Sequence, residues 1–379
     1  MKNKIMAITP YFYPEAGGVA NHTYNLYKII AEKGYEIVVV TSWNGKGIKK
    51  EKRNGMRVYM LPFQFKFSNT PISLKWKKQI KEIIEKESPD LINGHMPVPF
   101  ICDVAFSVSG EIPFILKYHH GGSMKKGKFF MDLLIMAYES IFLKRLFKKS
   151  KAIIASSEFV TNEFLKSYLE KTSTIPPGID TKLFKPSKNK EKYRILFVAN
   201  LIKSEYYKGL NYLLEAIKII KKQIPEIKLV VVGEGNLREH YENTARNLGL
   251  EKNVEFRGKV DRKNIVKEYQ KSWVVIVPSL FDATPNVLLE AMACKIPVIG
   301  TKIGGIPYVI DNNFTGLLIQ KKNPKAIANA VLKLLKNPRI AEKFGREGYK
   351  KVKESFTWEI QAEKTIKLYN EVLSRKNKK

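Results

Sequence analysis

The chain has 379 residues, of which 44% are hydrophobic and 27% charged, a balance typical of globular proteins and not of disordered or fibrous ones. This length fits two domains of ordinary size better than a single core. No stretch approaches the roughly 20 apolar residues that a membrane-spanning helix needs. The short apolar run near the N-terminus soon meets Pro10 and Pro14, so we do not expect a signal peptide.

The charge is strongly unbalanced, with 67 Lys and Arg against 36 Asp and Glu and a formal net charge of +31. Such a chain attracts polyanions, which include nucleic acids, anionic membrane surfaces and phosphorylated substrates. A coding bias toward lysine explains the same excess, so the charge alone does not name a partner. The two cysteines, Cys102 and Cys294, lack metal-ligand spacing and predict buried thiols in a reducing, cytoplasmic location.

The first 40 residues predict one βαβ unit. The apolar run 5–8 and the β-branched run 37–40 are typical of strands that are buried on both faces. Between them lie a Pro- and Gly-rich loop over 10–18 and apolar residues at helical spacing, which end at Gly34. Further buried strands are expected at 58–61, 91–92, 114–116 and 152–155.

A second series of strands and helices starts at Arg194. The expected strands are 195–198, 228–232, 254–256, 274–277 and 297–300, and the helices between them include 212–222 and 286–293.

Two segments between the series predict an interdomain linker. They are the Pro-rich stretch 174–178 and the polar run 185–192. We therefore expect an α/β protein with an N-terminal domain over 1–185 and a C-terminal domain over 190–357. A final helix starting at residue 358, within 358–379, is expected to pack back on the first domain.

The motif with the clearest chemistry spans 278–293, after a predicted strand and into a predicted helix. Thr284 is a candidate N-cap and Pro285 a candidate first helical residue. The N-terminus of a helix presents unpaired N–H groups and a positive dipole end, so it suits a diphosphate. The carboxylates of Asp282 and Glu290 suit sugar or ribose hydroxyls, although Asp282 by itself fits a capping residue equally well.

The order of motifs along nearly the whole chain closely resembles family 4 of the retaining GT-B glycosyltransferases, the glycosyl transferases of group 1. The motifs that carry the resemblance are PEAGGV at 14–19, PDLINGH at 89–95, ASSE at 155–158, IPPGID at 175–180, the Lys-Gly pair at 208–209, the stretch 226–235, PSLFDATPNVLLEAMA at 278–293, PVIG at 297–300, GGIP at 304–307 and FTW at 356–358. Each motif is weak alone, but their order and spacing together are specific. The resemblance implies a GT-B fold, in which two Rossmann-like domains face each other across a cleft.

The resemblance assigns roles to residues of the second half. It implies that Glu290 holds the ribose of the donor and that Asp282, where the family more often has Glu, faces the transferred sugar. Lys208 is implied to pair with the diphosphate, where an ammonium neutralises the leaving group. Asn286 and Val287, at the start of the same helix, complete the implied donor contacts.

Two glycine pairs are implied to approach the donor. The resemblance places Gly17 and Gly18 beside the donor phosphates, where backbone N–H groups come close because there is no Cβ. A simple turn is the alternative interpretation of this pair. Gly304 and Gly305 resemble a loop that passes near the donor or its sugar.

One histidine is implied to lie near the sugar, and one position departs from the family. Counting along the strand favours His119, whereas the glycine that follows favours His120. Asn200 stands where the family usually has an arginine that clamps the diphosphate. Because Asn carries no charge, donor affinity is expected to rest on Lys208, helped by Lys203.

Together these features predict a retaining, metal-independent hexosyltransferase that moves a sugar from a UDP- or GDP-sugar to a glycan or lipid-linked acceptor. No cofactor and no metal site are expected, and the sequence contains no Asp-x-Asp triplet. One alternative is a basic nucleic-acid-binding module, which the absence of a recognised nucleic-acid motif disfavours, so no nucleic acid partner is expected. The other is a different GT-B enzyme, such as a sugar-nucleotide epimerase.

The segment 125–151 joins an apolar stretch over 129–137 to a basic end. It fits a core helix whose basic C-terminus complements the helix dipole. It also fits a helix that lies on an anionic membrane and presents a lipid acceptor. In the second interpretation, the cytoplasmic protein is peripheral at the inner membrane face.

Overall fold

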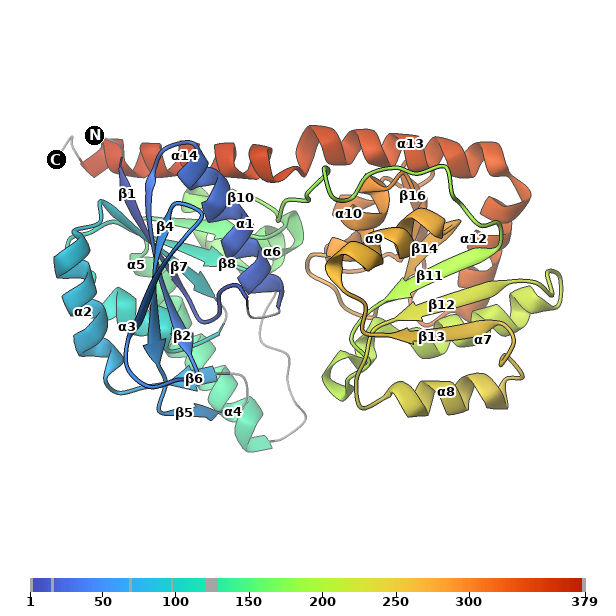
Figure 1. Cartoon of the computed structure of the whole chain (residues 1–379), viewed down its shortest axis with the longest axis horizontal. Coiled ribbons are helices and arrows are strands. Elements are labelled where there is room, and N and C mark those ends of the chain that lie inside the picture. Colours follow the sequence, from blue (N-terminus) through green and yellow to red (C-terminus); the bar gives the residue numbers. More distant parts are fainter. Residues whose placement is uncertain (1–2, 15–16, 68–69, 97, 120–128, 377–379) are drawn as a thin grey trace. The chain divides into compact units, whose positions relative to one another are not determined.

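Figure 1 shows a computed structural model of the chain, which describes residues 3–14, 17–67, 70–96, 98–119 and 129–376. The chain divides into two compact units. The first comprises Met1–Gly178 and Trp358–Lys379, and the second comprises Ile179–Thr357. Each unit is built on one main sheet.

The first unit has an eight-stranded sheet in the order β10-β9-β8-β7-β1-β2-β4-β3. All neighbouring strands are parallel except β3 and β4. Apolar runs such as that of β1 lie in the middle, where both faces of a strand are buried. The strands are β1 (Lys4–Thr9), β2 (Glu36–Trp43), β3 (Lys49–Arg53), β4 (Met56–Pro62), β7 (Leu91–Met96), β8 (Phe114–Tyr118), β9 (Ala152–Ala155) and β10 (Thr172–Thr174), with a separate hairpin of β5 (Phe65–Phe67) and β6 (Thr70–Ile72).

Helices cover both faces of this sheet. One face packs against α1 (Gly18–Glu32) and α14 (Trp358–Lys376), which contact each other. The other helices of this unit are α2 (Trp76–Glu87), α3 (Ile101–Ser107), α4 (Phe129–Tyr138), the π-helical η1 (Glu139–Leu143), α5 (Lys144–Lys149), α6 (Glu158–Phe164) and the 3₁₀-helical η2 (Lys166–Lys171).

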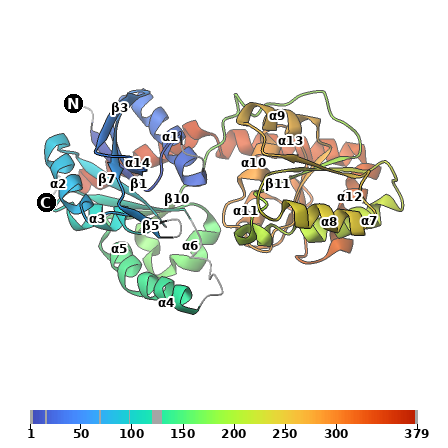
Figure 2. The same ribbon diagram turned by 60° about the horizontal axis from the view of Figure 1, so that its bottom comes forward.

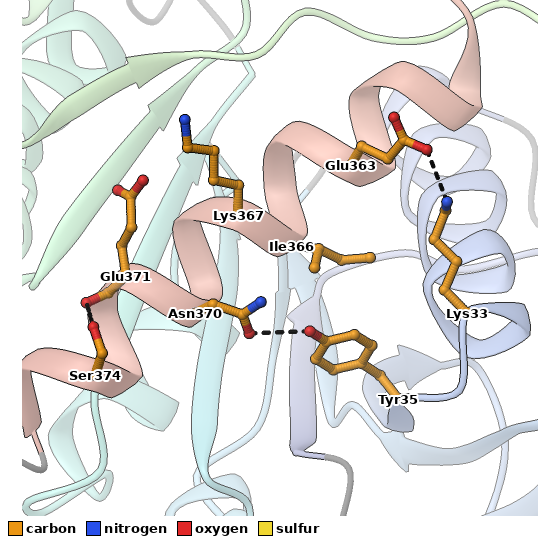
Figure 3. Close-up of a pocket in the computed structure, with 8 residues that line it drawn as sticks. All are labelled: Lys33, Tyr35, Glu363, Ile366, Lys367, Asn370, Glu371 and Ser374. Atoms are coloured by element: carbon orange, nitrogen blue, oxygen red, sulfur yellow. Dashed lines mark hydrogen bonds and ion pairs between the residues drawn. The ribbon is translucent and has the colours of Figure 1, made fainter.

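The end of α1 and the outer side of α14 meet in the pocket of Figure 3. The Lys33 ammonium lies 2.9 Å from a carboxylate oxygen of Glu363, and the Tyr35 hydroxyl donates to the Asn370 carbonyl oxygen at 3.0 Å. The helix that ends the described chain is thereby joined to the first βαβ unit.

The second unit has a six-stranded, fully parallel sheet in the order β13-β12-β11-β14-β15-β16. Renumbered within the unit, this order is 3-2-1-4-5-6, that of the Rossmann fold. The strands are β11 (Arg194–Val198), β12 (Lys228–Val232), β13 (Val254–Gly258), β14 (Val274–Val277), β15 (Val298–Thr301) and β16 (Gly316–Ile319).

Helices cover both faces of the second sheet, as Figures 1 and 2 show, and an apolar core layer lies on each side of it. On one face lie α7 (Leu210–Lys221), α8 (Arg238–Asn247) and α12 (Pro324–Lys336). On the other lie α9 (Arg262–Lys271), α10 (Asn286–Ala293) and α11 (Ile306–Val309). The long α13 (Pro338–Ser355) contributes to both layers.

The chain changes unit at Gly178, before the stretch that we expected to end the first domain. The Ile179 N–H donates to the Phe356 carbonyl at 2.7 Å, and Phe184 lies in the core of the second unit. The polar run 185–192 also belongs there, because Lys190 donates through its ammonium to a carbonyl of the second unit, that of Lys295. Local bonding thus places residues 179–192 in the second unit.

Several elements lie outside the sequence predictions. The strand β3 is polar throughout, and β10 and β16 were not expected either. Both cysteines are buried free thiols. Among the described residues, no helix is long and apolar enough to cross a membrane.

Candidate active site

The second sheet has a topological switch point between β11 and β14. The chain leaves β11 toward one side of the sheet order and leaves β14 toward the other, so the loops after these strands diverge. In open α/β sheets such a point forms a crevice at the carboxyl ends of the strands, where ligands bind. The loops that follow β11 and β14 carry Lys208 and Asp282.

Lys208 and Asp282 form an ion pair at this point, with Nζ and Oδ2 2.9 Å apart. Lys208 ends the 3₁₀ helix η3 (Lys203–Lys208), and Gly209 follows with φ 77°. A Cβ on Gly209 would lie 2.3 Å from the Pro278 carbonyl oxygen, so glycine lets the two loops pack together. Burial, the largest single effect, lowers the pKa of the Lys208 ammonium, but Asp282, Tyr207 and Glu205 together raise it by more, so the net pKa is raised.

The glycine pair after β15 packs directly against Asp282. The Gly305 N–H donates to the Asp282 carbonyl at 2.7 Å. Gly304 has φ 52°, and a Cβ there would lie 2.2 Å from the same oxygen. A Cβ on Gly305 would lie 2.1 Å from the Ala283 carbonyl oxygen. The sequence-predicted residues Lys208, Asp282 and the glycine pair therefore form one cluster.

Glu290 lies on α10, half-buried, and accepts a hydrogen bond from the Tyr269 hydroxyl of α9 at 2.5 Å. Burial raises the pKa of Glu290 to about 7, although the Tyr269 hydrogen bond and the charge of Arg262 act to lower it. This carboxyl group therefore changes its charge near neutral pH, unlike an ordinary glutamate.

The helix α10 has the expected bounds, but its cap differs from the expectation. Asn286 is its first residue and Pro285 its N-cap, with no side-chain capping bond, so the expectation of Thr284 as the N-cap is wrong. One carboxylate oxygen of Asp282 instead accepts from the Thr284 N–H at 3.3 Å. The N–H groups of Asn286 and Val287 lie in the first turn, where intrahelical acceptors are missing, and that of Asn286 donates instead to the Thr284 carbonyl at 3.0 Å.

Asn200, at the arginine position of the family, pairs with an acidic side chain. Its amide nitrogen donates to the Glu205 carboxylate of η3 at 2.8 Å. Lys203 is exposed and lies at the start of η3. Asn200 is therefore a neutral amide that already has a partner.

The first sheet also has a switch point, between β1 and β7. Gly17 lies after β1 with φ 151° and is the N-cap of α1, whose first residue is Gly18. Among the described atoms, none lies within 4 Å of a Cβ built on either glycine. The N-terminus of this 15-residue helix therefore has open space beside it, as an approaching anion requires.

Three histidines gather at the same switch point. His22 lies on α1, His95 near the end of β7, and His119 directly after β8. The His95 and His119 rings share a hydrogen bond of 2.8 Å, and the ring centroids of His22 and His119 are 4.6 Å apart. His120, the alternative to His119, lies outside the described residues.

The histidine cluster has ligand atoms of the kind that transition metals bind. One nitrogen from each ring lies within 4.8 Å of the others. Both nitrogens of His95, however, already take part in hydrogen bonds. Burial lowers the pKa of His22 and of His95, and the charge of the fully buried Lys117 lowers both further. A metal ion would have to break those bonds and tolerate the ammonium. We therefore interpret His95 and His119 as a hydrogen-bonded pair against which the His22 ring packs, with neither of its nitrogens hydrogen-bonded among the described residues.

Sequence reasoning missed several residues of these sites. Tyr269 and His22 lie on helices at positions that no motif marks, and the partners of His95 come from distant segments. The one available signal for His22 was its position four residues after Gly18, which places its ring one helical turn from the glycine that we expected at the donor site.

Family comparisons cover most of the chain. Residues 178–351 match the family described as "Glycosyl transferases group 1", and residues 16–183 match "Glycosyltransferase Family 4". The chain is 24% identical over 385 residues to the phosphatidylinositol N-acetylglucosaminyltransferase gpi3 subunit of Schizosaccharomyces pombe, which covers 98% of this chain and 81% of the relative.

Solved structures show the same architecture. Sucrose-phosphate synthase from Thermosynechococcus elongatus superposes with a TM-score of 0.82 at 22% identity, covering 99% of this chain and 100% of the other. Anabaena HepE in complex with UDP superposes with a TM-score of 0.77 at 16% identity, covering 98% and 100%. The expected GT-B fold is confirmed. Because the two family matches together run without a gap from residue 16 to residue 351, the chain belongs to family 4 of the GT-B glycosyltransferases.

Proposed function

We propose that the protein is a retaining transferase that uses a UDP- or GDP-sugar as donor and needs no metal ion. The observation that carries the proposal is the Lys208–Asp282 ion pair beneath the glycine loop at the switch point. Support for the nucleotide comes from HepE, which is similar in fold and was solved with UDP. Support for metal independence comes from the lack of an Asp-x-Asp triplet and from the lysine that supplies charge in its place.

The ion pair suggests how a donor is accommodated. A diphosphate that approaches Lys208 offers a second anion, so the ammonium turns from Asp282 to the phosphate. The released Asp282 carboxylate then accepts hydroxyl groups of the transferred sugar. Glu290, on the adjacent helix, accepts the ribose hydroxyls, and the first-turn N–H group of Val287, beside Asn286, faces the phosphates.

The chemical step keeps the configuration of the sugar. The bond between the anomeric carbon and the diphosphate oxygen breaks, and the acceptor hydroxyl oxygen bonds to the same face. The departing diphosphate oxygen takes the acceptor's proton, so no side chain serves as general base. Lys208 stabilises the charge that develops on the leaving group. In the first unit, Gly17 and Gly18 approach the phosphates and His119 contacts the sugar.

We also propose that the acceptor is a lipid-linked molecule at an anionic membrane surface. The described side chains of α4 and η1 include large apolar residues that are roughly half exposed or more, namely Leu133, Met136, Ile141 and Phe142. Exposed basic residues follow directly on α5, namely Lys144, Arg145, Lys148 and Lys149. An apolar face bordered by cations suits a monolayer of anionic lipids. The relative that glycosylates phosphatidylinositol supports this class of acceptor.

Isothermal titration with UDP, GDP, ADP and their sugar conjugates tests the donor. We expect one nucleotide to bind saturably, Glu290→Ala to weaken it, and Asp282→Ala to lose mainly the additional affinity that the sugar gives. Addition of EDTA should leave binding unchanged. Failure of every nucleotide to bind at millimolar concentration would overturn the proposal and favour the basic binding module.

A further inference from the structure

Five side chains of the first unit form one line of hydrogen bonds that runs from α14 to the end of β8. They are Tyr369, Asn93, Tyr27, His95 and His119 in that order. The successive distances are 2.6 Å (Tyr369 OH to Asn93 Oδ1), 3.0 Å (Tyr27 OH to Asn93 Oδ1), 2.9 Å (Tyr27 OH to His95 Nε2) and 2.8 Å (His95 Nδ1 to His119 Nε2). All except His119 are fully buried or nearly so, which makes an unpaired polar group costly.

The orientation of Asn93 fixes the first two bonds. Its amide nitrogen donates to the Ile115 carbonyl of the neighbouring β8 at 3.1 Å, so its oxygen points to the tyrosines. An amide oxygen can only accept. Both hydroxyls, of Tyr369 and of Tyr27, therefore donate their protons to Asn93.

The remaining protons follow by counting. Tyr27 has one proton and gives it to Asn93, so its oxygen must accept from the Nε2–H of His95. Burial, with a smaller contribution from the charge of Lys117, lowers the pKa of His95 to about 3, so the ring is neutral and carries one N–H. Its Nδ1 then accepts from the Nε2–H of His119.

The opposite order is disfavoured by the same distances. If Tyr27 donated its proton to His95 instead, no proton would lie between the Tyr27 oxygen and the Asn93 oxygen. These two oxygens would then face each other with lone pairs alone at 3.0 Å, which is repulsive. Tyr369 cannot relieve this, because its single proton is held in the shorter bond to Asn93, at 2.6 Å against 3.3 Å to Tyr27.

We propose that Asn93 is a positioning residue, which through Tyr27 and His95 holds His119 as the Nε2–H tautomer. Neutral His119 then has Nδ1 as an acceptor. This inference rests on the proposed contact between His119 and the transferred sugar. In this tautomer Nδ1 accepts the proton of a sugar hydroxyl, whereas in the other tautomer the same nitrogen would donate to the hydroxyl oxygen, so the tautomer sets the direction of that bond.

Replacing Asn93 by leucine tests the order of protons. Without the amide oxygen, Tyr369 is free to donate to Tyr27, which then donates to Nε2 of His95, and the order reverses as far as His119. Tyr369→Phe is the matched control, because it removes one hydroxyl from the same amide but leaves Tyr27 donating to Asn93.

The readout is ¹⁵N NMR of histidine-labelled full-length protein at pH 8, with signals assigned through His95→Gln and His119→Gln. We expect Nε2–H at both rings in the wild type and in Tyr369→Phe, and Nδ1–H at both in Asn93→Leu. An Nδ1–H signal for His119 in the wild type, or an unchanged tautomer in Asn93→Leu, overturns the proposal. If Asn93→Leu does not fold, Tyr27→Phe should give a mixture of tautomers, and a single unchanged tautomer there overturns it equally.

Kinetics separate this inference from the proposed function. Asn93→Leu should lower kcat by about 10- to 100-fold, as loss of an outer hydrogen bond does in other sites, with the nucleotide Kd unchanged. Reversed tautomers with an unaltered kcat would overturn the positioning role, while the nucleotide titrations would still stand. Loss of nucleotide binding in the wild type would instead contradict the proposed function, and the tautomers would remain measurable without any substrate.

Discussion

At the scale of single residues, Lys208 is held by a carboxylate whose place a diphosphate would take. The ammonium is three-quarters buried, so few other anions can reach it. The neighbouring Lys203, at the other end of the same short helix, is exposed. These two lysines differ in burial and pairing but not in charge.

We therefore expect Lys208→Met to weaken binding of the nucleotide by about 10- to 100-fold, since charge-assisted hydrogen bonds contribute roughly 1.5–3 kcal/mol. Lys203→Met, which removes the same charge, should change the Kd by less than about threefold. Titration calorimetry at one ionic strength measures both. Equal losses in the two variants would mean that general charge, and not the paired lysine, binds the phosphates.

Glu290 gives the stability of the protein a pH dependence of unusual sign. Its pKa is raised to about 7 in the folded protein, from 4.5, so the folded state holds more protons between these values than the unfolded state. Stability from this group is full below the lower pKa and falls as the pH rises through 7. The loss amounts to at most about 3 kcal/mol.

Glu290→Gln cannot titrate, so it should become more stable relative to the wild type as the pH rises from 5 to 8. Urea unfolding at both pH values, followed by circular dichroism, measures the difference. Other groups titrate alike in both proteins and cancel. Parallel changes in the two proteins would show that Glu290 titrates normally.

At the scale of elements, the glycine loop after β15 determines where Asp282 lies. Gly304→Ala forces a Cβ against the Asp282 carbonyl and also strains a left-handed backbone. Gly249→Ala strains a left-handed backbone too, at φ 68°, but no described atom lies within 4 Å of its Cβ. Gly249→Ala should lose about 1 kcal/mol of stability and Gly304→Ala more, because of the added clash, and only Gly304→Ala should lose the affinity gained from the sugar of the donor. Unchanged sugar binding in Gly304→Ala would separate the loop from the site.

The helix α14 offers a second test, because adjacent residues on it differ in burial. Tyr369 is fully buried in the core of the first unit, whereas Asn370 is exposed and bonds to Tyr35. Tyr369→Ala should lower the unfolding free energy by about 3–5 kcal/mol and Asn370→Ala by less than about 1 kcal/mol. Urea denaturation monitored by tryptophan fluorescence compares them. Similar values would show that α14 adds little to this core.

Elements with a strong local pattern were predictable from the sequence, and those defined by distant partners were not. The helix 286–293 was confirmed residue for residue, because a β-branched strand and a motif frame it. The strand β3 has the sequence KKEKR, which lacks any apolar alternation, and it exists only because β4 pairs with it at the edge of the sheet.

The sites divide in the same way. Asp282 and Lys208 belong to motifs, and the structure brings them together. Asn93 and Tyr369 are 276 residues apart, and no spacing rule connects an asparagine in a strand with a tyrosine in a late helix. Tyr269 meets Glu290 only because α9 and α10 cover the same face of the sheet.

At the scale of the whole molecule, the net charge of +31 makes association with anionic surfaces sensitive to salt. We expect sedimentation with vesicles that contain phosphatidylglycerol, less at 0.5 M than at 0.1 M NaCl, and little with pure phosphatidylcholine. Lys148→Glu with Lys149→Glu should reduce binding strongly, at about 1 kcal/mol per lysine removed. Lys321→Glu with Lys325→Glu, on the second unit, changes the net charge equally and is the control. Equal loss in both pairs would point to total charge and away from α5.

The order in which the chain passes through its units has a consequence for biosynthesis. The second unit is continuous in the sequence, from Ile179 to Thr357. The first unit is interrupted, because its helix α14 is synthesised only after the whole second unit. The second unit can therefore fold during translation, since domains generally fold as units once their residues emerge. The face of β1 and β2 that α14 covers keeps its apolar residues uncovered until α14 has left the exit tunnel. A nascent chain stalled before residue 358 should accordingly recruit chaperones through its first unit and not through its second.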